Sequence, residues 1–392
     1  MDTHDRNADN ASEFITPSTN AVQPEQELDY LPGQPEQELD YLPEQPESDK
    51  ASLIIEAAEL TPDVVIDHKK QAKKPLTPFQ ESLQRFRRDK RAIVSLVMIT
   101  LIVVIALFGP FIYQHIGGPY TSGVNSKVIG PGAYHTFDHQ ELDRTDELPS
   151  AQYWLGTDGL GRDIFARMMQ GMLISIIVAV AVEVVNVVLG ILIGVLAGYY
   201  GGWIDQFLAR LADLLFAFPG LLFVILVAGI LGSWADDNLS KIPVMGANGN
   251  ARLLLVSMAL AFTAWPLMAR YVRGQTMQLR EQQFVEAAKT SGTRDSTIIL
   301  RHIVPNLFSI VMVASTLDIS GTIVGEAGIS YLGLGVQPPG SSLGLMISDA
   351  SASLEAYPWE LLVPALTLVI IVLSFSFIGD GLRDAFDPHS KD

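Results

Sequence analysis

Three carboxylates interrupt segments of this chain that are otherwise apolar enough to lie in a membrane: Glu183, Asp318 and Glu326. A carboxylate at the centre of a bilayer costs about 2.5 to 3.5 kcal/mol on insertion scales, so it is expected to face a water-filled path or a partner helix. We predict that all three line a translocation pathway. The alternatives are that Glu183 only packs with Asn186 and that Glu326 is interfacial. No basic or histidine partner occurs in these segments, which disfavours a proton relay.

The residue patterns that carry catalysis in many enzymes are missing from the sequence. No Gly-Lys dipeptide occurs, so the chain lacks the glycine cradle and lysine of an ATP-binding P-loop. The histidines are scattered without a metal-ligand spacing such as HExxH, GxSxG does not occur, and there is no cysteine. We therefore expect a protein that is not an enzyme, holds no metal or other cofactor and does not hydrolyse ATP itself.

The most strongly punctuated stretch of the chain is 284–306, which reads FVEAAKTSGTRDSTIILRHIVPN. Gly292 suits the left-handed residue that ends a helix, Asp295 suits the N-cap of a following helix, and Pro305 suits the first turn of the next membrane helix. The stretch is therefore predicted to form two short helices joined at Gly292, followed by a long membrane helix.

This stretch also carries side chains that suit docking. Ala287 and Ala288 are small enough to let a helix enter a groove without clashes, and Phe284 and Val285 offer apolar anchors beside them. A contact that transmits force also needs the fixed turn angle that Gly292 provides. Judged by composition alone, an ordinary amphipathic loop lying on the membrane is the alternative interpretation.

The composition of the whole chain is that of a membrane protein. Of 392 residues, 48% are hydrophobic and only 18% are charged, which is too apolar for an ordinary soluble protein of this size. The formal net charge of −17 is concentrated in the first 75 residues and in one later loop. Those first residues are rich in Glu, Asp, Gln, Pro and Ser and contain an eleven-residue tandem repeat, QPEQELDYLPG followed by QPEQELDYLPE. We expect a disordered tail, with a short motif for an unknown partner as the alternative to plain low complexity.

Six apolar segments are long enough to cross a bilayer at 1.5 Å per residue. The first follows a basic cluster and the fourth ends at Arg270 and Arg273, so the positive-inside rule places these ends, the punctuated stretch and both termini in the cytoplasm. The expected spans are 92–112, 172–199, 204–231, 253–268, 306–325 and 361–378.

The spans divide the chain into parts with different expected roles. The parts are a disordered acidic cytoplasmic tail (1–78), a basic segment with the first membrane helix (79–112), an external loop with an amphipathic segment (113–170), a five-helix core (171–385) containing a cytoplasmic coupling loop (274–305), and a cytoplasmic tail (386–392).

Two spans carry residues that predict their packing. Gly190, Gly194 and Gly198 lie four apart on one face of the second span, which predicts that another helix approaches closely there. Pro219 is expected to kink the middle of the third span.

The punctuated stretch resembles the EAA motif of the permease subunits of bacterial ABC importers. The residues EAA at 286–288 are followed by Gly292 after a three-residue gap and by Pro305 thirteen residues later. His302 and Val304 stand where the general pattern has Ile and Leu, but RHIVPN resembles the peptide-importer branch. The residues to which the resemblance and the turn chemistry assign ATPase coupling are Phe284, Val285, Glu286, Ala287, Ala288, Gly292, Arg301, His302 and Pro305.

Further motifs make the chain similar to the C-type permease subunit of the oligopeptide/dipeptide family. They are RFRRDKRA (85–92), LGTDGLGRDIFARM (155–168), ISYLGLGVQPPGSSLG (329–344) and IGDGLRDAFDP (378–388). The resemblance spans about 80–390, and the acidic repeat tail lies outside it. It implies an all-α integral membrane protein with the six transmembrane helices of the type I ABC importer permease fold.

The resemblance also implies the partners of the chain. They are a homologous B-type permease, two cytoplasmic ABC ATPases that use ATP and Mg²⁺, an external solute-binding protein, a peptide substrate and the lipid bilayer, with no nucleic acid. The expected location is the bacterial inner membrane, crossed several times. Nickel, glutathione or another small solute are alternative substrates. A self-contained secondary carrier or channel that uses the buried carboxylates is the alternative of a different class.

Overall fold

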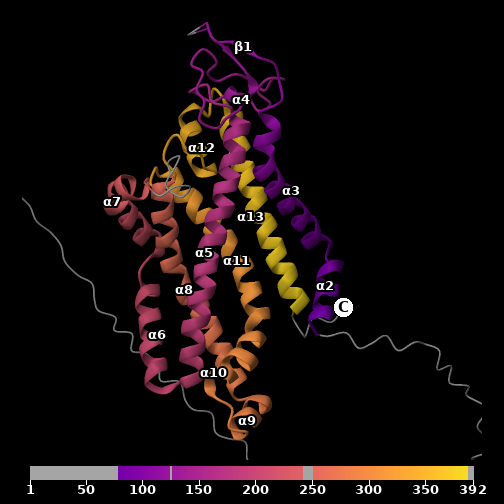
Figure 1. Ribbon diagram of the computed structural model, residues 1–392, viewed down its shortest axis with the longest axis vertical. Helices are drawn as coiled ribbons and strands as arrows, with labels where there is room; N and C mark the ends of the chain where they lie inside the picture. Colours follow the sequence, from indigo (N-terminus) through magenta and orange to yellow (C-terminus); the bar gives the residue numbers. More distant parts are fainter. Residues whose placement is uncertain (1–77, 124–125, 242–249, 387–392) are drawn as a thin grey trace, which may run out of the picture. The chain divides into compact units, whose positions relative to one another are not determined.

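A computed structural model describes residues 78–123, 126–241 and 250–386. The predicted disordered tail and its repeats, apart from Pro78, lie outside these residues, as does the C-terminal tail after Phe386. The described residues from Pro78 onward belong to one compact unit, and its architecture is helical (Figure 1).

Within the described residues, six helices are long and apolar enough to cross a membrane. They are α3 (Lys90–Tyr113), α5 (Ile164–Tyr200), α7 (Gly220–Leu239), α8 (Ala251–Arg280), α11 (Val304–Tyr331, continuing α10) and α13 (Pro358–Phe386). The shorter helices are α2 (Pro78–Arg88), α4 (Pro131–Tyr134), α6 (Gly202–Ala217), α9 (Gln283–Thr290), α10 (Asp295–Ile298) and α12 (Leu343–Ala350), with a small antiparallel pair of strands, β1 (Tyr120–Thr121) and β2 (Val128–Ile129).

The membrane helices bury small or apolar side chains on one side and expose apolar side chains on the other. On α3, Ala92 and Ile102 are buried, whereas Val97, Leu101 and Phe108 are more than half exposed. Apolar side chains exposed along a whole helix face are unfavourable in water and are matched by lipid. The pattern therefore fits a span of a bilayer.

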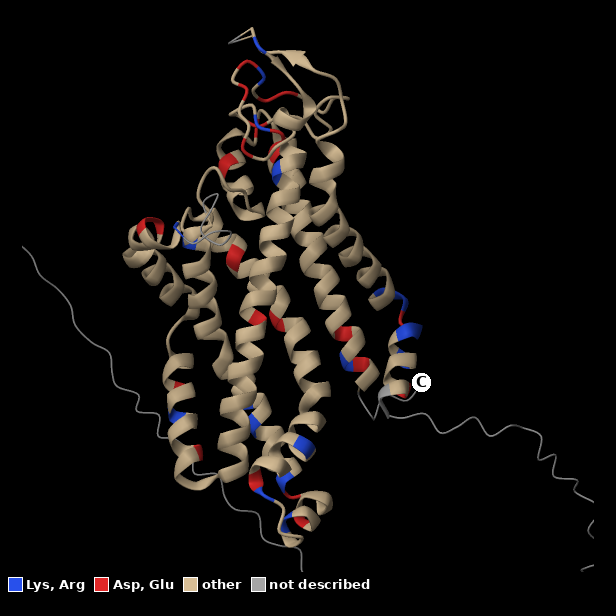
Figure 2. Ribbon diagram, in the orientation of Figure 1, with Lys and Arg blue, Asp and Glu red and all other residues tan. Residues whose placement is uncertain are grey.

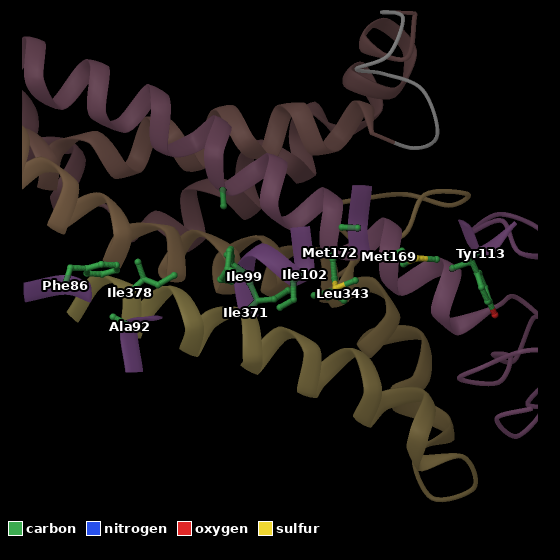
Figure 3. Close-up of a cluster of buried hydrophobic side chains, with 14 of the residues drawn as sticks. Phe86, Ala92, Ile99, Ile102, Tyr113, Met169, Met172, Leu343, Ile371 and Ile378 are labelled. Atoms are coloured by element: carbon green, nitrogen blue, oxygen red, sulfur yellow. The ribbon is translucent and has the colours of Figure 1, made fainter. Parts of the chain in front are cut away.

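The largest apolar cluster joins α3, α5 and α13. Its labelled side chains form a row along these helices in Figure 3, from Phe86 of α2 to Tyr113 at the end of α3. Close approach makes the row continuous, because a Cβ added at Gly381 of α13 would lie 2.4 Å from the Cβ of Ala92. The first and last membrane helices are thus packed together.

The predicted close approach at the glycine stripe of the second span is confirmed, and the partner is α8. A Cβ added at Gly190 would lie 2.3 Å from Cγ of Met268, and one added at Gly194 would lie 2.6 Å from the carbonyl oxygen of Ala269. The third glycine, Gly198, is equally crowded by the next turns of α8. Only residues without a side chain allow this separation of the two backbones.

The prediction of a single third span kinked at Pro219 is wrong, because the chain forms two helices there. Phe218 adopts an extended conformation (φ −85°, ψ 131°) after α6, and Pro219 is the N-cap of α7. A residue before proline is driven out of the helical region by a clash with the proline ring, so the helix ends. Figure 1 shows α6 near the end that carries α9 and α10, and α7 nearer the end that carries α12.

Two further differences concern the segments on either side of the core. The predicted amphipathic segment and second span merge, since α5 is one helix from Ile164 and is capped by Asp163, which accepts hydrogen bonds from the backbone N–H groups of Phe165 and Ala166. The Gly/Pro-rich segment after α11 leads into α12, a helix that the sequence did not predict.

The motif before α5 forms a loop held by buried charges. Asp158 accepts hydrogen bonds from Nε of Arg162 at 2.8 Å and from a terminal nitrogen of Arg167 at 2.5 Å, and both arginines also pair with Asp349 of α12 at 3.0 Å. Gly161 adopts φ +69°, and an added Cβ would lie 1.9 Å from a backbone oxygen of the preceding loop. The motif therefore fixes the start of α5 against α12.

Candidate functional site

The predicted pair of short helices exists as α9 and α10, joined at Gly292. Gly292 has φ +75° and donates its backbone N–H to the carbonyl of Lys289, while Thr293 donates to the carbonyl of Ala288. This pair of bonds is the Schellman motif, in which the left-handed residue satisfies carbonyl groups at a helix C-terminus. We call residues 283–298 the coupling hairpin.

The coupling hairpin is held on the membrane helices by apolar contacts. Val285 of α9 and Ile298 of α10 are fully buried, and they share a cluster with Val272 of α8 and Leu307 of α11. Because the side chains under both short helices lie in one packed cluster, the hairpin is expected to move with the ends of α8 and α11 rather than independently.

Tyr199 at the end of α5 contacts both halves of the hairpin. Its hydroxyl donates a hydrogen bond of 2.7 Å to Asp295 of α10, and its ring lies 5.1 Å from the ammonium nitrogen of Lys289 of α9. Arg280 at the end of α8 donates to the carbonyl oxygens of Gly198 and Tyr199 at 3.3 and 3.2 Å. A cation at these carbonyls is favourable because they carry the partial negative charge of the helix C-terminus.

The structure divides the predicted coupling residues into exposed and buried ones. Phe284 is 42% exposed, and Glu286, Ala287, Gly292, Arg301 and Pro305 are also exposed, whereas Ala288 and His302 are partly buried. Val285 is 0% exposed. The prediction that Val285 serves as a surface anchor is therefore wrong: its side chain fastens the hairpin from below.

The predicted N-cap at Asp295 is also wrong. Arg294 occupies the N-cap position without a side-chain bond, and Asp295 is the first residue of α10. Its carboxylate accepts from Tyr199 instead. After α10 the chain makes a π-helical turn, Ile299–Ile303, and α11 begins with Pro305 near its start as predicted. Proline has no N–H and clashes with the preceding turn of an α-helix, which accounts for a wider turn there.

Sequence reasoning missed some residues of this surface. Leu300 is 70% exposed beside the hairpin, and its only sequence signal is an apolar residue in the turn before Pro305. Tyr199 and Arg280 carry no local signal, because their partners lie 96 and about 80 residues away in the sequence.

Two of the three predicted pathway carboxylates come together. The side-chain nitrogen of Asn186 donates to Glu183 at 3.1 Å and to Asp318 at 3.2 Å, so α5 and α11 are joined across one amide. Glu183 is 6% exposed, and Asp318 is partly exposed. We call these three residues the acid cluster, and Figure 2 shows acidic segments of α5 and α11 next to each other midway along the helices.

The third predicted carboxylate lies apart from the acid cluster and is enclosed by the protein. Glu326 is 0% exposed, and its oxygens accept hydrogen bonds from Ser175 of α5 at 2.8 Å and from Ser330 at 2.7 Å. Both oxygens are therefore occupied by hydroxyl donors of the protein itself. This arrangement joins α5 to α11 a second time and suits a structural role. Within the described residues, no group of three or more His, Asp or Glu side chains is placed to hold a metal ion.

Comparison with known proteins relates the chain to transport systems. Residues 190–392 match the family described as binding-protein-dependent transport system inner membrane component, and residues 77–123 match the N-terminal TM domain of oligopeptide transport permease C. The chain is 39% identical over 315 residues to the glutathione transport system permease protein GsiD of Shigella flexneri serotype 5b, covering 80% of this chain and 92% of that protein. GsiD of Escherichia coli O6:K15:H31 is 38% identical with the same coverage. Among solved structures, inward-facing MetNI methionine ABC transporter aligns at a TM-score of 0.43 and 16% identity, covering 56% of this chain and 96% of that one.

Proposed function

Because this chain belongs to the family of inner membrane components of binding-protein-dependent transport systems and is an ABC importer permease, we propose that it imports oligopeptides or dipeptides. It forms half of the translocation pathway, and a homologous B-type permease forms the other half. The chain itself is not catalytic: two cytoplasmic ATPases hydrolyse MgATP, and an external solute-binding protein delivers the substrate.

The coupling role is supported by which side chains of the hairpin are exposed and which are buried. Its outer surface presents Phe284, Glu286 and Ala287, while Val285 and Ile298 beneath them are locked in the core. A small, exposed helix face can enter a groove of an ATPase, and a buried underside passes displacement on to the membrane helices. Closure of the ATPase dimer would push α9, and the shared cluster would carry that movement to α8 and α11.

The proposed membrane orientation follows from charge. Lys and Arg gather at α2 and at the end of the molecule that carries α9 and α10 (Figure 2). The positive-inside rule puts these ends in the cytoplasm, with both termini on the same side, in a bacterial inner membrane crossed six times. The loops around β1 and α12 then face outward, where the solute-binding protein docks.

Glutathione is a second candidate substrate, and a specific observation favours it. The relatives at 38–39% identity are described as glutathione transport permeases. Glutathione is itself a small peptide with a free ammonium group, so the same pathway chemistry serves both substrates. Solute choice between them rests mainly with the solute-binding protein, which meets the substrate first.

The test is uptake by the complete transporter reconstituted in proteoliposomes. Glu286→Arg reverses the charge on the exposed face of α9 and is expected to leave the subunit assembled but to separate ATP hydrolysis from uptake, with uptake falling by about tenfold or more. Glu81→Arg, at an exposed glutamate of α2 about 200 residues from the hairpin in the sequence, is the matched control and should transport as wild type. Normal uptake by Glu286→Arg contradicts the coupling role, and a wild-type complex that imports neither peptides nor glutathione contradicts the substrate class.

A further inference from the structure

The acid cluster holds more negative charge than the surrounding protein balances. Glu183 and Asp318 both accept from the one amide nitrogen of Asn186. No ion pair to either carboxylate occurs among the described residues, and the sequence of α11 contains no Lys, Arg or His. The one basic residue of α5, Arg167, pairs with Asp158 and Asp349. Two carboxylates at membrane depth therefore need either a proton or a cation that comes from outside the protein.

The buried atoms that lack partners indicate which kind of group fits the cluster. Oε1 of Glu183 and Oδ1 of Asn186 are buried without a partner at hydrogen-bond distance, with Asn186 0% exposed and Glu183 6% exposed. The hydroxyl of Ser315 on α11, which is also unpartnered, lies close to Glu183. Both atoms are acceptors, and the amide nitrogen of Asn186 is already engaged by the two carboxylates. An unpaired buried acceptor is costly, and the hydroxyl of Ser315 can donate only one hydrogen bond, so at least one of the two acceptors is left for a ligand that donates hydrogen bonds.

Asp318 connects this site to open space. It lines a cavity of about 290 Å³ between α8 and α11, whose wall includes Phe216 of α6, Thr263 of α8 and Gly321 of α11. The walls are mainly apolar apart from the carboxylate and two threonine hydroxyls. A charged group that enters this cavity meets Asp318 first, with Asn186 and Glu183 behind it.

We propose that the acid cluster binds the α-ammonium group of a peptide on its way through the membrane, an inference that rests on the proposed function. A primary ammonium has three N–H donors and one positive charge, which match the unpartnered acceptors and the missing counter-charge. Asp318 makes the first contact and Glu183 adds the second charge. Asn186 is a positioning residue, because its amide holds the two carboxylates at one point. The amide of Asn186 already satisfies part of the hydrogen-bonding capacity of each carboxylate. The cluster therefore binds the ammonium group weakly enough to release it during transport.

The test measures ATP-driven uptake of alanyl-alanine and of glutathione by the full transporter with its solute-binding protein. Asp318→Asn keeps the shape but removes the charge and is expected to lower uptake of both by about tenfold or more, while stimulation of ATP hydrolysis by the loaded binding protein persists. Asp318→Glu should restore most of the uptake. Asp380→Asn, an exposed aspartate of α13, is the matched control and should equal wild type. Glu183→Gln gives a second, independent measurement if Asp318→Asn does not assemble.

Each other outcome overturns the inference. If Asp318→Asn and Glu183→Gln both take up substrate as fast as wild type, the two carboxylates are protonated in the wild-type protein and bind no ammonium group. Parallel loss of uptake and of ATPase stimulation means that the cluster only stabilises the fold. A fall in wild-type uptake when choline replaces Na⁺ and K⁺ means that the cluster binds a metal cation. In all three cases wild-type uptake of peptide still supports the proposed function, whereas absence of wild-type uptake contradicts the proposed function itself.

Discussion

Adding a single methyl group at Gly194 is expected to destabilise the contact between α5 and α8. An alanine Cβ there would lie 2.6 Å from the carbonyl oxygen of Ala269 and 2.7 Å from Cβ of Val272. Neither atom is the free end of a flexible side chain, so the two helices must separate or shift. Overpacking of this kind costs about 1 to 3 kcal/mol. The cost falls on the helix pair that also holds the coupling hairpin.

The expected result can be measured as thermal unfolding of the purified transporter. With an unfolding entropy of about 2.1 cal/mol/K per residue over 392 residues, a loss of about 1 to 3 kcal/mol corresponds to a decrease in Tm of about 1 to 4 °C. Gly321→Ala is the matched control, because it adds the same methyl group to a membrane helix where nothing lies within 4 Å, and any gain in helix propensity is shared by both variants. Equal Tm values for Gly194→Ala and Gly321→Ala would refute the argument that backbone proximity requires glycine.

Two further predictions concern the ends of the molecule. Tyr199→Phe removes the hydroxyl that donates to Asp295 but keeps the ring, so the coupling hairpin should lose about 1 kcal/mol of local stability. Hydrogen exchange should show faster exchange of the backbone amides of α10 and no change in α13. Unchanged exchange in α10 contradicts the anchoring role of Tyr199. In the loop between α3 and α5, burial opposes ionisation of Glu141, but the hydrogen bond from Ser122 at 2.6 Å and the contacts with Tyr120, Asp143 and His139 together outweigh burial and lower the pKa of Glu141 to about 2. A lowered pKa stabilises the fold above the unfolded value of about 4.3 and loses this effect as pH falls through about 2. The difference in Tm between wild type and Glu141→Gln should therefore be present at pH 6 and vanish toward pH 2, and a difference that grows on acidification contradicts the assignment.

Local backbone chemistry accounts for the features that sequence reasoning predicted well. Gly292 ends a helix because glycine adopts φ +75° without strain, and Pro305 marks the start of α11 because it has no N–H and disturbs the turn before it. The spacing of three glycines on α5 likewise requires a close neighbour, whichever helix that is. Apolar length predicted the long membrane helices other than the third, because the bilayer imposes a minimum length on each helix separately.

The wrong predictions arise where a distant group competes with a local preference. Asp295 is a good N-cap residue, but the hydroxyl of Tyr199 takes its carboxylate. The sequence predicts that Val285 is an apolar anchor on the surface of the hairpin, but its side chain packs in the apolar cluster that α9 shares with α8 and α11. At Pro219 the proline signalled a local disturbance of the helix, and the clash with Phe218 ends α6, while α6 and α7 each pack against α8 as separate helices.

The sequence by itself determined that this chain is a membrane protein of several helices, where its helices turn, and that three carboxylates lie among apolar residues. These properties follow from hydrophobicity and backbone geometry, which act over a few residues. Only the tertiary structure decided that Asn186 joins its neighbour Glu183 to Asp318, which lies 132 residues after Asn186, while Glu326 is satisfied by serines elsewhere. Side chains on different helices meet through the packing of whole helices, and no short stretch of sequence encodes that packing.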